Sequence, residues 1–377
     1  MKKIIKKYII EIITISIILS LSLMNIYKAP LLSKNYNGYF FKMIIFIILS
    51  IFIGIILNKI KFKKIYKYRY IIYLINIFLL IYVLIFSSSI NHVKAWINLG
   101  FISIQPSEFT KITCPLLSIS FIKDKKYLKS FIIFLIPMIL ILIEPDTGNV
   151  LLLFIIFLFL VINKNNKKLI TSIIIILLII SSLIIFLFIT KEKLFINLFN
   201  GSLYYRLKRI ISFKNNYQIQ NALISIGNAK AFPIPLKDII IYIPEGVTDF
   251  IFSFSIANIG IILTIVLLMS YLVLILALVN KYIKIKNIYK KKIYGSFITV
   301  FTFQTTYNIL MNIGIVPIMG IPLPLYSYGG SSIISYFIFL FLINKKISSI
   351  EDKDNNNYKN NFHKVPEDKN YFDMELV

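Results

Sequence analysis

The chain has 377 residues, 58% of them apolar, with a mean hydropathy of +0.81 and a formal net charge of +26. Apolar runs long enough to cross a bilayer recur through the first 345 residues, which excludes a soluble domain, and the alternating segments typical of a β-barrel are absent. The basic residues lie in short clusters between apolar runs, as orientation-setting loop charges do, so nucleic acid is excluded as the expected partner. We therefore expect an all-α polytopic membrane protein.

Ten spans are predicted in chain order, at about residues 8–26, 40–58, 70–88, 106–122, 130–145, 147–162, 170–190, 250–280, 294–316 and 329–344. Lysine clusters precede the first span and follow the second, fourth, sixth and eighth, whereas the alternate loops hold few basic residues. The positive-inside rule then places both termini in the cytoplasm.

The spans form one predicted transmembrane domain, residues 1–345, with a large outer loop at 191–249. In this loop the basic stretch LYYRLKRIISF, 203–213, has apolar residues at helical spacing, which predicts a helix on the membrane surface. The polar, Asn-rich stretch 346–377 is expected to be a disordered cytoplasmic tail.

Acidic residues are concentrated on the predicted outer side. Seven of the nine that precede the tail lie there: Glu108, Glu144, Asp146, Glu192, Asp238, Glu245 and Asp249. Because orientation depends on Lys and Arg, these acids indicate polar chemistry at the outer ends of helices. The single cysteine, Cys114, and two distant histidines give no predicted metal site.

Glu108 and Lys111 follow Pro106 in the stretch 94–112 and share one helix face. Such a pair at the mouth of a span is either a structural ion pair or part of a cavity. Trp96 in the same stretch is expected to be an interfacial anchor. In EPDTGNVLLL, 144–153, Asp146 is predicted to cap the following helix.

Two further stretches each allow two interpretations. Arg206, Lys208 and Arg209 of the outer loop would bind either lipid headgroups or a pyrophosphate. Thr248 or Asp249 is placed to cap a helix, and a carboxylate there could equally be a general base.

The stretch 311–337 contains Pro317, Pro322 and Pro324, which forbid a regular helix. Non-helical backbone at membrane depth either lines a cavity or is buried in protein. A helix is expected to open at Gly329, Gly330, Ser331 and Ser332, with N–H groups that could bind an anion. The alternative is a purely structural re-entrant turn.

Taken together, these stretches resemble the SEDS family of bacterial cell-wall proteins, whose branches include RodA and FtsW. The matching motifs run from about residue 94 to 335 and read AWINLG, QPSEFTK, EPDTG, PEGVTDFIF and GIPLPLYSYGGSS. The last of them is highly specific for the family.

The resemblance implies a peptidoglycan glycosyltransferase. Members polymerise lipid II on the outer face of the bacterial cytoplasmic membrane, together with a class B penicillin-binding protein that makes the crosslinks. The family's essential acid corresponds to Asp249, which would take the proton from the 4-hydroxyl of the acceptor N-acetylglucosamine in an inverting transfer. Lys111, Arg209 or a divalent cation, Mg²⁺ or Mn²⁺, would offset the charge of the departing pyrophosphate, and no other cofactor is required.

The resemblance also implies the residues around the base. Those expected in the substrate cavity are Glu108, Lys111, Arg209, Trp96, Ser327, Gly329, Gly330 and Ser331. The chain departs from the family at four places. It has GNAK, 227–230, for G-S-G-G, IANIG, 256–260, for A-E-E-L-G, Glu144 for Gln and Asn149 for Thr. The loop changes bear on how substrate or partner is held.

The short region before the first span and the sequence motif MNIGIVP favour the elongation, RodA-like branch. The alternatives are a septal FtsW-like or sporulation polymerase, and a lipid II flippase. A transporter is expected to carry charges near the bilayer midplane, whereas the acids here lie at span ends, which favours chemistry.

Overall fold

A computed structural model describes residues 2–31, 33–87, 95–100, 102–162, 190, 213, 216–233 and 242–344. Its helices are α1 Lys2–Tyr27, α2 Tyr39–Lys59, α3 Phe62–Lys67, α4 Arg69–Phe86, α5 Ser107–Lys123, α6 Tyr127–Ile143, α7 Thr147–Val161, α11 Tyr217–Gly227, α12 Ile251–Ile283, α13 Ile288–Asn312 and α14 Gly330–Asn344. Two 3-10 turns, η1 Ala29–Leu31 and η2 Lys34–Tyr36, join α1 to α2. The strands β1 Ile97–Asn98 and β2 Ser103–Ile104 form an antiparallel hairpin before α5.

The predicted all-α fold is confirmed, because described helices occupy every predicted span except 170–190. That span lies outside the described residues apart from residue 190. Within the described part, four helical stretches are long and apolar enough to cross a membrane: Tyr8–Tyr27, Lys34–Lys59, Arg69–Phe86 and Ile251–Ile283. The total of ten spans, the tail at 346–377 and most of the outer loop are therefore still predictions.

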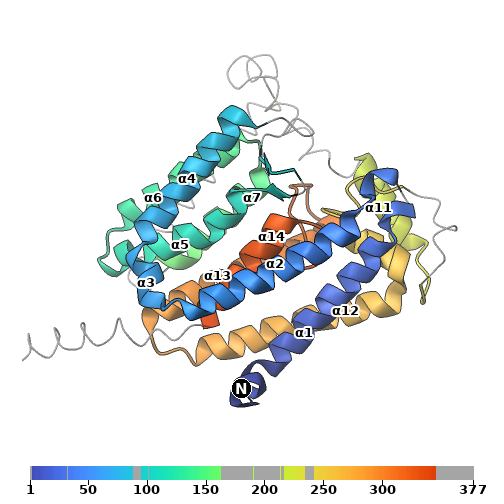
Figure 1. Cartoon of the computed structure of the whole chain (residues 1–377). Helices are drawn as coiled ribbons and strands as arrows, with labels where there is room; N and C mark the ends of the chain where they lie inside the picture. The colour runs from blue at the N-terminus through green and yellow to red at the C-terminus, as the bar shows by residue number, and fades with distance from the viewer. Residues whose placement is uncertain are drawn as a thin grey trace, which may run out of the picture.

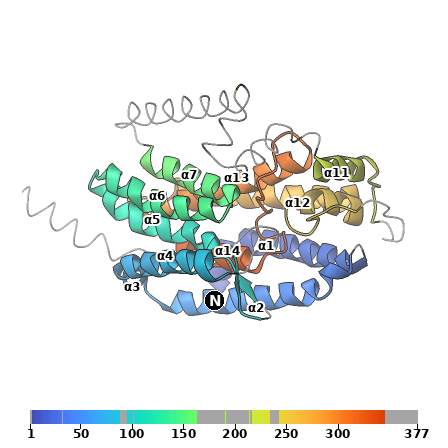
Figure 2. The ribbon, with the colours of Figure 1, turned by 90° about the horizontal axis from the view of Figure 1, so that it is seen from above.

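The helices form two groups that are joined through α13 and α14. The helices α4, α5, α6 and α7 pack together in one group, and α1 packs along α12 in the other (Figure 1). Helix α14 contacts α2, α5 and α13, so it lies at the centre of the molecule, as the view from above also shows (Figure 2). The closest approach, between α14 and α2, is possible because Gly54 leaves room for Phe341 and Gly330 leaves room for Phe46.

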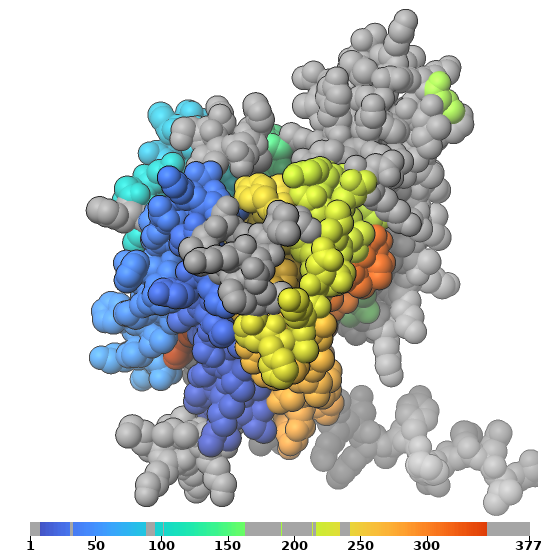
Figure 3. Space-filling model, turned by 90° about the vertical axis from the view of Figure 1, so that its right-hand side faces the viewer, coloured from blue at the N-terminus to red at the C-terminus, as the bar shows by residue number. Residues whose placement is uncertain are grey.

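A second hydrophobic cluster lies where α11 packs on α12. Ile219 of α11 meets Val247, Phe250 and Phe254 there. Figure 3 shows α11 and the start of α12 on the same face as α1 and α2. This cluster fixes the turn that precedes α12. The sequence did not predict α11 or α3.

Helix α12 is interrupted at Gly260, which has φ 84° and ψ 168°. The N–H groups that the break releases find partners in the chain just after α11: Ile261 N donates to Lys230 O at 3.0 Å, and Ile262 N donates to Ala231 O at 3.1 Å. Backbone polar groups at membrane depth need such partners. The break therefore accommodates the segment that follows α11.

Gly260→Ala is expected to destabilise this junction. The backbone conformation is one that only glycine adopts readily, and a Cβ would lie 2.7 Å from Phe232 C and 2.8 Å from Ala231 O. We expect a loss of about 1–3 kcal/mol in unfolding free energy, seen as a lower thermal midpoint and faster proteolysis near residue 232. Gly227→Ala is the matched control, because a Cβ there meets nothing within 4 Å. Equal stability of the two variants would contradict the assignment.

Candidate active site

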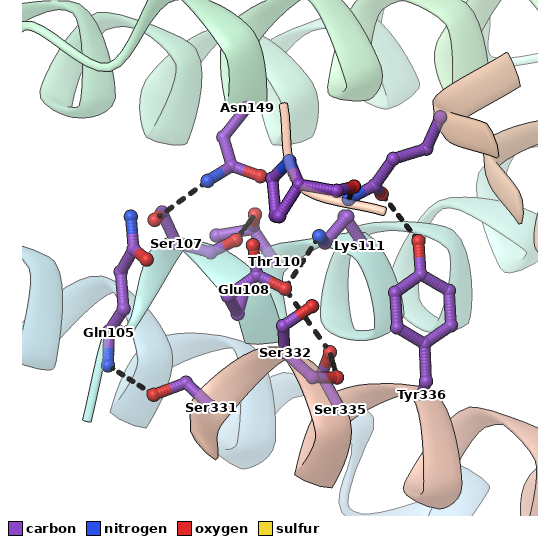
Figure 4. Close-up of polar contacts among 12 residues, drawn as sticks. Gln105, Ser107, Glu108, Thr110, Lys111, Asn149, Ser331, Ser332, Ser335 and Tyr336 are labelled. Atoms are coloured by element: carbon purple, nitrogen blue, oxygen red, sulfur yellow. Dashed lines mark hydrogen bonds and ion pairs between the residues drawn. The ribbon is translucent and has the colours of Figure 1, made fainter. Parts of the chain in front are cut away.

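The predicted ion pair between Glu108 and Lys111 is present and deeply buried. Lys111 Nζ lies 2.7 Å from Glu108 Oε2, and each side chain is 3% exposed. Ser335 of α14 donates its hydroxyl to the same carboxylate oxygen at 3.4 Å. Lys111 also lies 5.5 Å from the ring centroid of Tyr336, whose hydroxyl donates to Gln304 of α13. The pair therefore joins α5 to α14 and α13 (Figure 4).

Asp146 caps α7, as predicted. Its Oδ1 accepts from the backbone N–H of Asn149 at 3.0 Å, and its Oδ2 accepts from the side-chain amides of Asn149 and Gln105, each at 2.8 Å. The backbone N–H of Gln105 in turn donates to Ser331 Oγ at 2.8 Å. The cap thereby connects the start of α7 to the start of α14.

Glu144 lies in the turn between α6 and α7 and is fully buried. Within the described structure neither carboxylate oxygen has a hydrogen-bond partner. Burial, and to a lesser extent the charge of Asp146, raises the pKa of Glu144 to about 9. In its uncharged form Glu144 would match the glutamine that the SEDS motif usually carries at this position.

Glu144→Gln should change how stability depends on pH. A carboxyl group whose pKa is raised by folding stabilises the folded state while it is protonated. This stabilisation is fully present below the unfolded pKa of 4.5 and is lost as pH rises towards about 9. Glutamine cannot ionise, so the variant should unfold at a higher temperature than the parent at pH 8 and at a similar temperature at pH 4.5.

Thermal unfolding in detergent from pH 4.5 to 9 measures this difference. Asp124→Asn, at an exposed acid in the loop after α5, is the control and should leave the pH profile unchanged. A constant offset between Glu144→Gln and the parent at every pH would show that Glu144 is ionised in the folded protein.

The turn at 244–250 leads into α12 and is held by the segment that precedes α14. Tyr328 N donates to Val247 O at 2.8 Å. Ser327 Oγ donates to Thr248 O at 2.6 Å. The structure thus brings two separate predicted motifs together, and Ser327, one of the predicted cavity residues, makes a direct contact between them.

Asp249 is half-buried in this turn. Its Oδ2 lies 3.6 Å from the position that a Cβ on Gly320 would take, so the carboxylate stands against the non-helical segment before α14. Its main-chain carbonyl accepts from Asn308 Nδ2 at 2.8 Å and from Asn312 Nδ2 at 3.1 Å. Neither asparagine is predicted as a site residue from the sequence. Their spacing of four along an apolar helix was the available signal.

The prediction that Thr248 or Asp249 caps α12 is wrong. Phe250 occupies the N-cap position and makes no side-chain capping bond. Thr248 Oγ1 instead donates to Glu245 Oε2 at 2.9 Å. The cap is replaced from elsewhere in the fold, because Asn312 Oδ1 accepts from Ser253 N at 2.9 Å.

The start of α14 lies between these two groups of polar residues. Ser331 belongs to the Asp146 group through Gln105, and Ser327 belongs to the Asp249 turn. Gly329 and Gly330 lie between them in the chain, and α14 begins at Gly330 as predicted. The short stretch 327–331 therefore links both halves of the candidate site.

Several predicted residues are not brought into this arrangement. Trp96 lies directly before β1 and is half-buried, and its cavity role is untested. Arg206, Lys208, Arg209, Glu192 and Asp238 lie outside the described residues. Over the described ranges, no group of three or more His, Cys, Asp or Glu side chains could hold a metal ion. The divalent cation is therefore still a hypothesis.

Comparison with known proteins supports one family. The sequence profile of the FtsW/RodA/SpoVE family, described as a cell cycle protein, matches residues 3–352. The chain is 32% identical to the probable peptidoglycan glycosyltransferase FtsW of Wigglesworthia glossinidia brevipalpis, over 91% of this chain and 94% of that one. It is 33% identical to the protein of the same description from Buchnera aphidicola subsp. Schizaphis graminum, over 78% and 87% of the two chains.

A solved structure has the same fold. This structure is reported as "Structural coordination of polymerization and crosslinking by a peptidoglycan synthase complex". One of its chains superposes on the present chain with a TM-score of 0.73. The match covers 88% of this chain and 95% of that one at 19% sequence identity. At that identity the likeness establishes the architecture alone.

Proposed function

Because the chain belongs to the FtsW/RodA/SpoVE family, we propose that it is a peptidoglycan glycosyltransferase that polymerises lipid II at the outer face of the bacterial cytoplasmic membrane. One observation carries the mechanism. The carboxylate of Asp249 stands against Gly320, and its turn is bonded to Ser327, so the base and the predicted cavity segment share one location.

In the proposed reaction Asp249 accepts the proton of the acceptor 4-hydroxyl as that oxygen attacks the donor sugar. The bond to the undecaprenyl pyrophosphate breaks, and the configuration inverts. A positioned base of this kind typically contributes about 10²–10⁴-fold. The Ser327 hydroxyl holds the turn by donating to the main-chain carbonyl of Thr248, so the element that presents Asp249 is fixed to the segment before α14.

The departing pyrophosphate needs positive charge. Lys111 is 2% exposed and already paired with Glu108, so its charge is largely compensated within the protein. Arg209 or a divalent cation is then the better candidate to meet the pyrophosphate, and the buried pair supports the shape of the cavity beside α14. This division of roles is part of the proposal.

The partner is proposed to be a class B penicillin-binding protein. The similar solved structure is a synthase complex that couples polymerization to crosslinking, which supports a crosslinking enzyme as the partner. The elongation role predicted from the sequence stands beside a septal role, which the FtsW names of the two relatives favour. A fluorescent fusion at the sidewall would support elongation, and one at the septum would support division.

The test of activity uses the purified full-length chain with its partner and labelled lipid II. Glycan strands separated on a gel are expected with both proteins and not with the partner alone. If labelled lipid II crosses the membrane of proteoliposomes and no strand forms, transport replaces polymerisation as the function.

A further inference from the structure

The N–H of Ser253 lies in the first turn of α12, where N–H groups have no carbonyl partner within their own helix. Ser253 N donates instead to Asn312 Oδ1 at 2.9 Å, while Asp249 O accepts from Asn312 Nδ2 at 3.1 Å. A side-chain amide of α13 therefore satisfies this N–H group and joins it to the carbonyl of Asp249.

Asp249 lies outside the helix that follows it. Helix α12 begins at Ile251, and Asp249 is left in the preceding turn, with its carbonyl position set by α13. The hydroxyl of Ser253 adds a second bond to Asn312 Oδ1 at 2.8 Å. Asn312 therefore uses both the oxygen and the nitrogen of its side-chain amide to define where the helix starts.

Asn308, one turn earlier in α13, fixes the other side of the site. Its Nδ2 donates to Asp249 O and to Ile321 O, each at 2.8 Å. The same amide group thus sets the separation between the Asp249 turn and the segment that contains Gly320. The distance from the carboxylate to that segment follows from this pair of bonds.

Neither asparagine is explained by packing. Both are fully buried, and a buried amide is unfavourable unless its hydrogen bonds are made. An apolar residue at either position would fill the space between α12 and α13 without that requirement. Both amides converge on one carbonyl, that of Asp249.

We propose that Asn308 and Asn312 are positioning residues that hold the Asp249 carboxylate against the segment preceding α14, an inference that rests on the proposed function. A base that must reach a substrate hydroxyl is sensitive to small displacements, and a misplacement of about 1 Å can cost about 100-fold in rate. The two amides provide that placement by donating to the main-chain carbonyl of Asp249.

The test compares Asn308→Ala and Asn312→Ala with the parent in the lipid II polymerisation assay, using the full chain with its partner. We expect kcat to fall by about 10- to 100-fold with KM changed by less than about threefold. The acid limb of the pH–rate profile should also move. A variant that is merely less folded scales the whole profile and leaves that limb in place.

The matched control is Asn258→Ala. Asn258 is also a fully buried asparagine of α12, and its amide donates to Asn25 Oδ1 at 2.6 Å, away from Asp249. This variant should lower the thermal midpoint and keep both kcat and the acid limb. If Asn312→Ala does not fold, Asn312→Thr keeps a hydroxyl acceptor for Ser253, and the same change in the acid limb is expected.

Asp249→Ala distinguishes a failure of the positioning role from a failure of the base assignment. If it is inactive while both asparagine variants keep the parental kcat and acid limb, the positioning role is wrong and the base assignment stands. If it polymerises at the parental rate, the base assignment itself fails. Equal behaviour of Asn258→Ala and Asn312→Ala in every measurement would reduce both residues to structural roles.

Discussion

Asp249→Ala is expected to lower the rate of glycan polymerisation by about 10²–10⁴-fold and to leave the protein folded. The hydrogen bonds described above that hold its turn go to main-chain atoms, from Tyr328 to Val247, from Ser327 to Thr248 and from Asn308 to Asp249. Alanine keeps all of these main-chain acceptors. The loss should therefore appear in the chemical step, measured as strand formation from labelled lipid II at a saturating concentration.

Two further variants define the cause of that loss. Asp249→Asn keeps the shape of the side chain without a base and should be as slow as Asp249→Ala. Glu245→Gln alters the neighbouring acid, which accepts from Thr248, and should stay within a few-fold of the parent. Polymerisation by Asp249→Ala at the parental rate would contradict the role of Asp249 as the base.

Lys111→Met is expected to lower the free energy of unfolding more than any other substitution described above. The variant leaves the carboxylate of Glu108, 3% exposed, without its ion-pair partner. Breaking a buried pair from one side costs about 3–5 kcal/mol, because the remaining charge is still buried. Thermal unfolding in detergent should show this as a large fall in the midpoint temperature.

The double variant Glu108→Gln with Lys111→Met should recover most of that loss, because no unpaired charge is then left in the interior. Lys126→Met is the surface control. Its partner Asp124 lies 3.6 Å away and both side chains are about half exposed, so its effect should stay within about 1 kcal/mol. A single Lys111 variant as stable as this control would mean that Glu108 is reached by water or takes up a proton.

The features predicted well from the sequence are those that depend on neighbouring residues. Apolar runs locate the described spans, and the turn residue Asp146 predicts the cap of α7, which needs only three residues of chain. Glu108 and Lys111 are likewise one helical turn apart. In each case both partners lie within a single local pattern.

The features that were missed depend on distant residues. Asp249 looks like a helix cap because nothing nearby reveals that Asn312 bonds to Ser253. Gly260 lies in an apolar run that reads as continuous helix, and its break becomes visible only with the carbonyls of Lys230 and Ala231 in place. Local preference is overridden in both places by tertiary contacts.

The two longer stretches that depart from the family pattern lie next to each other. GNAK, 227–230, ends at Lys230, and IANIG, 256–260, ends one residue before Ile261, whose N–H donates to Lys230 O. Asn258 of the second stretch bonds to Asn25 of α1. These two of the four differences from the family therefore lie at one junction between the segment after α11, α12 and α1.

The break at Gly260 also determines how the piece of helix behind Asp249 behaves. Residues 251–259 lie between the amide of Asn312 and the carbonyls of Lys230 and Ala231. A helix of that length is not stable by itself in water and depends on what is packed against it. Asp249 therefore precedes a short helical segment that is held at both ends, and residues 230–231 hold the end furthest from Asp249. A substitution or a bound partner that pulls residues 230–232 away is expected to displace Asp249 without contacting the candidate site.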